Sequence, residues 1–471
     1  MGRWIRGACL LVSVAASALV LAAPAAAQTS THYTATLPDG GTWVADVPSN
    51  WNGTLLVYGH GMTANVAGDA RIGLQGVLLS LGYALTGSSY DPSGPVYAMN
   101  SAVNDQVETI AAVESSVLPR PATTVIAWGE SEGGLVAALM NQDDQGQLSG
   151  TLSVCGQVAG SSVAENDALA GAYAVNTLLN SGPPIQLVGY QTDQQSQQAA
   201  SELMQVAQTA QTTAAGRARL TLADALWNAT TWTAVNIGGY DTNPSVYLPL
   251  LSPPPTDYNI WEWEQYETMF APGSQVVSFG TNSSWQIEQA EQGQPAWNAG
   301  VNFTTLLNNS PYLKEVTTLY NEAGANLTAD LETLTADANI TADPTALSRL
   351  IATSAPTGVL HVPALDVHTV ADQLVPVQNE NYYGRLVSAA GDGAMLGDAY
   401  VFRQGHCNIN AAEIIAGLHA LEQRISTGGW GTSLAPSSLN AAGTALNIGT
   451  PAFIPYSPPP LTAPSSSSLL R

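Results

Sequence analysis

The sequence predicts an α/β fold, built on a mostly parallel β-sheet with helices on both faces. Short apolar segments rich in β-branched residues alternate with helix-forming segments in the first third of the chain and again near its end. The apolar segments are also continuous, which is typical of strands buried on both faces. Parallel strands need helical crossovers, so the two observations agree.

The first elements are a hairpin and a series of buried strands. "HYTATLP" and "TWVADVP" are alternating strands joined by the turn Asp-Gly-Gly at residues 39–41. The strand "GTLLVYGHG" then leads to a helix expected over residues 70–81 and to the strand "GYALTGSSY". The amphipathic helix "NSAVNDQVETIAAVESSVL" follows and should begin at an Asn or Ser cap. The strand "TTVIAWG", a helix from Glu132 and the strand "GTLSVCGQVAG" complete this part.

A different composition separates the two α/β parts. Residues 165–355 are rich in Gln, Asn, Thr and Ala and contain helix-like stretches such as "SQQAASELMQVAQTAQTTAAG". The alternation resumes with the strand "VPALDVHTV", a helix near residues 377–389, the strand "DAYVFRQ" and the helix "NAAEIIAGLHALEQRI". We therefore expect one core domain, residues 28–164 and 356–430, with a large, mainly helical cap inserted between its sixth and seventh strands.

The two ends of the chain are expected to lie outside this domain. Residues 1–27 combine Arg3 and Arg6, a short apolar run and an A-x-A site, which predicts a secretory signal peptide and export. A membrane anchor is disfavoured because the run is short for a bilayer span, and we expect no stable membrane insertion elsewhere. Residues 431–471 form a C-terminal extension whose Pro/Ser-rich end, "PYSPPPLTAPSSSSLLR", should be loose.

The charge balance excludes some partners. The formal net charge is −24, and Lys314 is the single lysine. Nucleic acid and anionic membranes would be repelled by such a surface. Charged residues make up only 10% of the chain, so the acidity reflects scarce bases rather than the dense carboxylate of a halophile. This composition favours an acidic medium, in which protonated carboxyl groups repel one another little.

Cysteine usage predicts one long-range link. Cys9 leaves with the signal peptide, so Cys155 and Cys407 remain in an oxidising compartment. A disulfide between them is expected, and it requires two segments far apart in sequence to meet. The alternative is a buried core thiol at Cys155 and a free thiol at Cys407.

Residues 129–133, Gly-Glu-Ser-Glu-Gly, match the pattern G-x-S-x-G at a predicted strand–helix junction. A serine in such a sharp turn is strained, and glycines two positions away avoid a collision with neighbouring backbone. An ordinary glycine-rich turn has the same composition, so the pattern alone makes Ser131 only a candidate nucleophile. A serine hydroxyl also needs an imidazole base, and that base needs a carboxylate.

His406 and Asp372 are the candidates for these two roles. His406, in "FRQGHCN", follows the last core strand, and Asp372, in "HTVADQLVP", follows the strand before it. Loops at the carboxyl ends of parallel strands face the ligand in open α/β folds. The order Ser131…Asp372…His406 is that of the α/β-hydrolase architecture. The less favoured candidates are His32, His60, His361, His368 and His419 as base, and Asp366, Asp392 and Asp398 as acid.

The motifs "VYGHG", "GESEGG", "VHTVADQLVP" and "GHCN" occur in the order and contexts of secreted bacterial α/β-hydrolases, and the chain resembles their esterase and lipase members. The resemblance covers about residues 32–160 and 356–425. It implies an eight-stranded type of sheet, with the serine, aspartate and histidine named above as nucleophile, acid and general base. The backbone amides of Met62 and Glu132 would form the oxyanion hole, and His60 would shape the turn and lie near the substrate.

The residues around the candidate serine bear on specificity. Cys407 directly after His406 is similar to the His-Cys arrangement of tannase and feruloyl esterase relatives. In those relatives the partner cysteine precedes the nucleophile, where this chain has Glu130, so specificity for phenolic acids does not carry over. Glu130 is expected to be a buried, hydrogen-bonded carboxylate or to tune His406, and Glu132 is expected to cap its own helix.

The inserted block offers candidates for a substrate wall. Trp261 and Trp263 alternate with glutamates and would share one face of a strand, where indoles could contact an acyl or aromatic group. The leading function is an exported serine hydrolase that cleaves carboxylic esters, small or polymeric, through an acyl-enzyme. A prolyl-type serine peptidase and a non-catalytic binding protein on the same scaffold are the alternatives. The sequence holds no metal cluster, phosphate loop or dinucleotide fingerprint, so no cofactor is expected.

Overall fold

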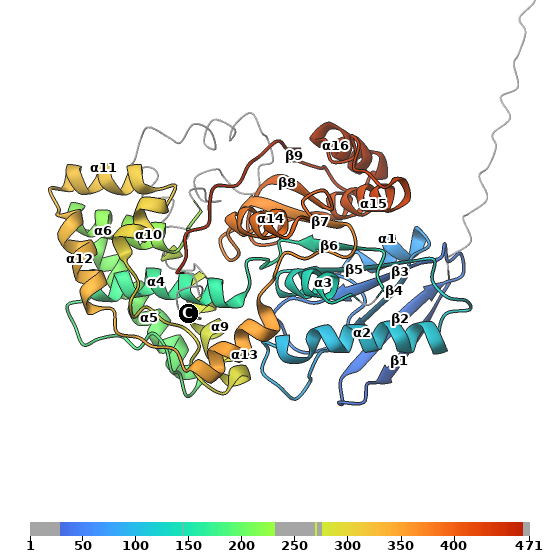
Figure 1. Ribbon diagram of the computed structural model, residues 1–471, viewed down its shortest axis with the longest axis horizontal. Coiled ribbons are helices and arrows are strands. Elements are labelled where there is room, and N and C mark those ends of the chain that lie inside the picture. The colour runs from blue at the N-terminus through green and yellow to red at the C-terminus, as the bar shows by residue number, and fades with distance from the viewer. Residues whose placement is uncertain (1–28, 145, 231–268, 271–275, 465–471) are drawn as a thin grey trace, which may run out of the picture.

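The computed structural model describes residues 29–144, 146–230, 269–270 and 276–464. Figure 1 shows a sheet with helices on both faces and a helical lobe beside it. The sheet has nine strands in the order β1-β2-β4-β3-β5-β6-β7-β8-β9. The strands are β1 (Ser30–Thr36), β2 (Thr42–Pro48), β3 (Thr54–Gly59), β4 (Ala84–Ser88), β5 (Thr124–Glu130), β6 (Gly150–Val154), β7 (Ala364–Ala371), β8 (Leu396–Gln404) and β9 (Phe453–Ile454).

Most of this sheet is parallel, which confirms the predicted fold class. The strands from β4 through β3, β5, β6 and β7 to β8 pair in parallel, whereas β1 and β2 at one edge and β9 at the other pair antiparallel. Every residue of β3 is buried, as expected for a parallel strand covered on both faces. The ninth strand was not expected, because β9 comes from the C-terminal extension and pairs with β8.

Helices cover both faces of the sheet. The helices α2 (Met99–Ser116) and α3 (Glu132–Gln142) pack with Leu55 of β3, whereas α1 (Gln75–Ser80) and α15 (Ala411–Thr427) pack with the next residue, Leu56. Alternate residues of one strand therefore enter two separate apolar layers. No helix in the described ranges has both the length and the apolar character that crossing a membrane demands. The remaining core helices are α14 (Gln378–Ala390) and α16 (Pro436–Leu446).

The chain between β6 and β7 forms the helical lobe, which has its own apolar core around side chains such as Trp227, Phe303 and Tyr320. Many of its helices begin at a Thr, Asn or Asp side chain that accepts a backbone N–H of the first turn, which explains why a block so rich in these residues is helical. The helices are α4 (Ser161–Leu179), α5 (Asp193–Ala210), α6 (Ala214–Leu226), α9 (Val276–Glu291), α10 (Phe303–Asn309), α11 (Leu313–Ala323), α12 (Leu327–Asp337) and α13 (Pro344–Ser354).

Two local predictions in the core were wrong. The helix expected over residues 70–81 is only α1, because Gly73 has a φ of +85°, a conformation that a helix does not allow. The helix α2 does not begin at an Asn or Ser cap. It begins after Ala98, whose N–H donates to the carboxylate of Glu132 at 3.2 Å. A side chain distant in sequence thus replaces the local cap.

The C-terminal tail is another correction. Its described part, residues 455–464, is not loose but runs from β9 across to α4 of the helical lobe (Figure 1). Leu461 and Thr462 are buried there. The side chain of Asn228 donates to the backbone oxygen of Thr462 at 2.9 Å and accepts its N–H at 3.0 Å. The Pro/Ser-rich composition predicted a loose tail. Composition says nothing about hydrogen-bond partners on a distant element, such as Asn228.

Candidate active site

The candidate nucleophile occupies a tight turn between β5 and α3. Ser131 has φ 59° and ψ −120°, a conformation rarely adopted by residues other than glycine. A Cβ added to Gly133 would lie 2.0 Å from the backbone oxygen of Gly59, and one added to Gly129 would lie 2.4 Å from that of Gly133. The glycines of the motif are therefore required because three backbone segments meet here, and the turn holds the Ser131 hydroxyl away from the helix axis.

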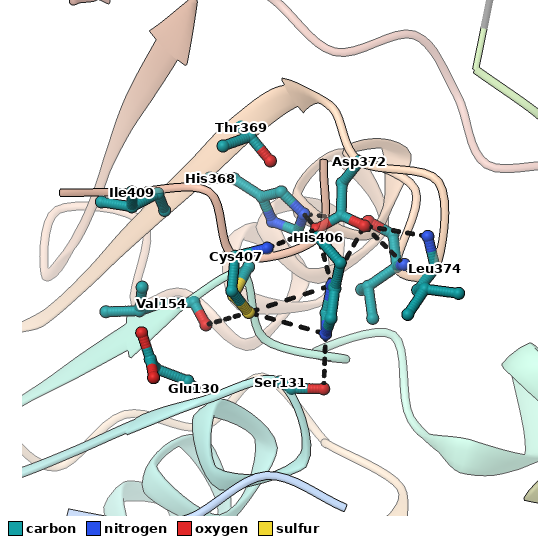
Figure 2. Close-up of a disulfide and its surroundings, with 12 residues drawn as sticks. Glu130, Ser131, Val154, His368, Thr369, Asp372, Leu374, His406, Cys407 and Ile409 are labelled. Carbon is teal, nitrogen blue, oxygen red and sulfur yellow. Dashed lines mark hydrogen bonds and ion pairs between the residues drawn. A yellow bond between two sulfur atoms is a disulfide. The ribbon is translucent and has the colours of Figure 1, made fainter. Parts of the chain in front are cut away.

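The structure brings Ser131, His406 and Asp372 into one hydrogen-bonded chain (Figure 2). The Ser131 Oγ lies 2.9 Å from His406 Nε2. On the other side of the ring, Nδ1 lies 2.8 Å from Asp372 Oδ2 and 3.0 Å from Oδ1. The serine, aspartate and histidine come from the ends of β5, β7 and β8, as the sequence order predicted. This arrangement can take a proton from the hydroxyl and stabilise the resulting imidazolium.

The carboxylate of Asp372 is fully enclosed and held from several directions. The backbone N–H groups of Leu374 and Val375 donate to Oδ1, each at 2.9 Å, and that of Cys407 donates to Oδ2 at 3.4 Å. Burial alone would raise the pKa of Asp372, but the adjacent His406 and His368 lower it well below its usual range. The group therefore remains an anion.

His368 is the residue near this chain that the sequence reasoning passed over. It lies in β7, is fully buried and has its ring beside Asp372 (Figure 2). Its Nε2 is 3.6 Å from Asp372 Oδ2, and its Nδ1 is 2.6 Å from Glu380 Oε1. The spacing His-x-x-x-Asp at the end of a buried strand could have indicated this contact. A histidine in a fully buried strand needs polar partners, and the aspartate four residues later is a candidate.

The structure contains the disulfide expected between Cys155 and Cys407, with the two Cα atoms 5.3 Å apart. Cys155 directly follows β6, the strand beside β5, and Cys407 directly follows His406. The bond therefore ties the loop of His406 to the sheet edge next to Ser131, and the alternative of two free thiols is not what the structure contains.

Arg71 adds a second tie that was not predicted. Its Nη1 donates to Glu130 Oε1 at 2.9 Å and to the backbone oxygen of Ile409 at 2.7 Å. The hydroxyl of Tyr58 also lies 3.5 Å from Glu130. Burial raises the pKa of Glu130, while Arg71 and His406 oppose the rise. Glu130 is thus a largely enclosed, hydrogen-bonded carboxylate, and Arg71 links it to the loop after His406.

Glu132 does not cap its own helix, so that prediction was wrong. Its side chain is buried and accepts the N–H of Ala98 instead. Burial raises its pKa to about 8. Its carboxyl group therefore bonds the residue before α2 and not the first turn of α3.

The remaining candidates differ in where they lie. A Cβ added to Gly61 would be 3.2 Å from Ser131 Cβ, so the turn before Met62 runs against the serine. His60 is buried under this turn, with Nδ1 2.8 Å from the oxygen of Gly61 and its ring stacked on Tyr90. It therefore packs beneath the turn and holds it in place. The predicted wall residues Trp261 and Trp263 lie outside the described residues.

A cavity of about 60 Å³ lies between the core and the helical lobe, next to the serine turn. It is lined by Gln157, whose N–H donates to the Ser131 oxygen at 3.3 Å, and by Leu374, which contacts Asp372. Trp227 and Glu165 of the lobe form another wall. Burial raises the pKa of Glu165 to about 8. The cavity is lined by both polar and apolar side chains, and its volume suits only a small group.

No family model matches the chain. It is 27% identical over 450 residues to the o-phthalyl amidase of Xanthobacter agilis, covering 88% of this chain and 92% of the amidase.

Similar solved structures are esterases and peptidases. Feruloyl esterase B from Aspergillus oryzae is 12% identical with a TM-score of 0.38, over 84% of this chain and 80% of that one. The esterase LipA from Xanthomonas oryzae is 16% identical with a TM-score of 0.34, over 84% and 87%. The acylaminoacyl peptidase of Pyrococcus horikoshii is 8% identical with a TM-score of 0.36. The match covers 80% of this chain but only 38% of the peptidase.

The parallel strand order and the serine at the β5–α3 turn are those of the α/β-hydrolase fold.

Proposed function

We propose that the protein is a serine hydrolase that cleaves carboxylic ester bonds through an acyl-enzyme. Ser131 is the nucleophile, His406 takes its proton and returns it to the leaving alcohol, and Asp372 orients the imidazole. The observation that carries the proposal is the hydrogen-bonded chain Ser131–His406–Asp372, with the serine held in a strained turn. A non-catalytic binding protein would gain nothing from this strain or from the enclosed carboxylate.

The oxyanion hole of the proposed enzyme consists of the backbone N–H groups of Met62 and Glu132. Glu132 begins α3, where N–H groups lack helical partners and the helix dipole favours a negative charge. Met62 belongs to the turn that contacts Ser131 through Gly61. Two such donors stabilise the tetrahedral intermediate as its charge develops.

The substrate is a small or polymeric ester whose acyl group enters between the core and the helical lobe. The cavity lined by Gln157, Trp227 and Leu374 supports this placement, because two of these residues contact the serine turn or Asp372. The lobe then acts as the cap predicted for residues 165–355.

Amide hydrolysis is the second candidate, and the relative named an o-phthalyl amidase favours it. The same serine chemistry cleaves amides, but the leaving amine must be protonated as it departs. A prolyl-type peptidase is one form of this alternative.

The enzyme is proposed to be exported after removal of residues 1–27. The Cys155–Cys407 disulfide supports this, because such bonds persist in oxidising compartments. The net charge of −24 argues against nucleic acid as a partner.

A substrate panel tests the proposal. Purified protein is assayed from pH 3 to 9 with p-nitrophenyl esters of graded chain length beside acyl and aminoacyl p-nitroanilides. Ester turnover well above anilide turnover is expected, together with fluorophosphonate labelling of Ser131. Dominant anilide turnover would favour the amidase alternative, and absence of both turnover and labelling would exclude serine hydrolysis.

A further inference from the structure

A second buried imidazole contacts the acid of the proposed triad. His368 in β7 has no exposed surface. Its Nδ1 lies 2.6 Å from Glu380 Oε1, its Nε2 lies 2.9 Å from the backbone oxygen of Val375, and the same Nε2 is 3.6 Å from Asp372 Oδ2. All three neighbours are oxygen acceptors, and two of them are carboxylates. Figure 2 shows this ring beside Asp372 and above His406.

These contacts define the protonation of the ring. A backbone oxygen only accepts, so Nε2 must carry a proton to bond Val375. With that proton in place, Nδ1 bonds an ionised Glu380 only if it is protonated as well, which makes the ring a cation. Burial alone would lower the pKa of His368, but the contacts with Asp372 and Glu380 raise it to about 10.

We propose that His368 is a positioning residue, a charged imidazolium that keeps Asp372 ionised and aimed at His406 and so lets the triad work in acid. The proposal rests on the proposed function of the triad. Its physical basis is charge balance. Without a cation beside it, the Asp372 carboxylate favours the protonated form of His406, which cannot take the serine proton. The charge of His368 offsets part of this effect, so hydrolysis continues at lower pH.

The other titratable groups around His368 fit this role. Glu380 reaches it from α14, and Asp366 on β7 and Asp398 on β8 have carboxylate oxygens within 4.8 Å of that of Glu380. Burial and the charges of Glu380 and Asp398 raise the pKa of Asp366, so it takes up a proton readily. Tyr383 and Tyr400 nearby have pKa values raised by burial and remain neutral. Among these groups, Glu380 is the one within hydrogen-bond distance of His368 Nδ1.

The test compares pH–rate profiles of variants. His368→Gln removes the cation. The double variant His368→Gln/Glu380→Gln removes both charges and leaves a neutral, hydrogen-bonded pair, so it buries no unpaired carboxylate and keeps the test open if the single variant does not fold. His361→Gln, at an exposed imidazole, is the control.

We expect the acid limb of kcat/KM to move up by about one pH unit in the single variant, which is the size of shift that one nearby charge produces. In the double variant we expect a smaller shift of the same sign. We also expect kcat to fall roughly tenfold while KM changes little, because Asp372 is held less firmly.

A second readout does not depend on turnover. In ¹⁵N spectra of histidine-labelled protein at pH 7 to 8, one imidazole should have both nitrogens protonated, and this signal should vanish in both variants but not in His361→Gln. A neutral ring at His368, or a folded double variant with the wild-type acid limb, would overturn the inference. If the wild-type protein neither turns over esters or amides nor reacts with fluorophosphonate, the proposed function fails instead.

Discussion

In the proposed enzyme, Ser131 contributes reactivity rather than stability. Its side chain is partly exposed, and its Oγ has a single strong contact, to His406. Ser131→Ala should therefore lower hydrolysis by a factor on the order of 10⁴ or more, since triad members act as one unit. The melting temperature should stay close to that of the wild type, because alanine keeps the Cβ and the strained backbone. Fluorophosphonate labelling at full strength in this variant would show that another residue is the nucleophile.

Asp372 is distinguished from the second buried aspartate of the same segment by its contacts. Asp372→Asn should reduce the rate by about 10³–10⁴, because an amide presents its N–H₂ to His406 and disturbs the tautomer. Asp366→Asn, buried in β7, is the matched control and should lose far less. Rates are compared with esters at saturating concentration. A greater loss for the folded Asp366 variant would mean that the acid was wrongly assigned.

At the scale of elements, the disulfide links β6 to the loop after β8. It closes a loop of 252 residues, for which chain entropy gives at most about 4–5 kcal/mol of stabilisation. Its effect on rate should be greater, because a shift of about 1 Å in the His406 loop can cost on the order of a hundredfold.

Cys407→Ser and Cys155→Ser should therefore each lower kcat at temperatures where circular dichroism still shows a folded protein. Either single variant breaks the same bond, so the double variant should lose no more than either alone. Thiol titration of the denatured, unreduced protein without residues 1–27 should find no free thiol, and two thiols would contradict the link.

The start of α2 depends on a carboxyl group from α3. Glu132 accepts the N–H of Ala98, and burial raises its pKa to about 8. A carboxyl group with a raised pKa contributes stability that is fully present below its ordinary value and is lost as pH rises through 8. Glu132→Gln keeps an acceptor for Ala98 and cannot ionise. Calorimetry should find little change at pH 5 and a higher melting temperature for the variant at pH 9, and equal losses at both pH values would contradict this role.

The sequence predicted what depends on neighbours along the chain. Buried parallel strands have a continuous apolar composition, and Ser131, Asp372 and His406 could be chosen because each follows such a strand. It did not predict the partners that meet across the fold. Glu132 bonds Ala98 at a separation of 34 residues, and Asn228 bonds Thr462 at a separation of 234. Local propensity depends only on residues close in sequence and cannot indicate such pairs. For this reason the cap of α2 and the ordered tail at residues 455–464 were not predicted.

The whole molecule combines a strong acidic excess with carboxyl groups buried inside it. Glu165 and Glu288 of the helical lobe are enclosed, and burial raises their pKa values to about 8 and about 7. Asp69 in the core also has a raised pKa because of burial and the adjacent Asp46. Asp372 has the opposite shift. Most of these groups therefore hold their protons longer in the folded than in the unfolded protein.

This distribution predicts that the protein is more stable in mild acid than at neutral pH. For Glu165 and Glu288, the stabilisation is complete below their ordinary pKa near 4 and is lost as pH rises through about 7 to 8. Asp372 acts in the other direction only at lower pH, where it would be protonated. The melting temperature at constant ionic strength should thus fall between pH 5 and 8. Glu165→Gln/Glu288→Gln should flatten this decline, because the amides cannot release a proton. A melting temperature that rises from pH 5 to 8, or drops sharply between pH 5 and 4, would contradict adaptation to an acidic medium.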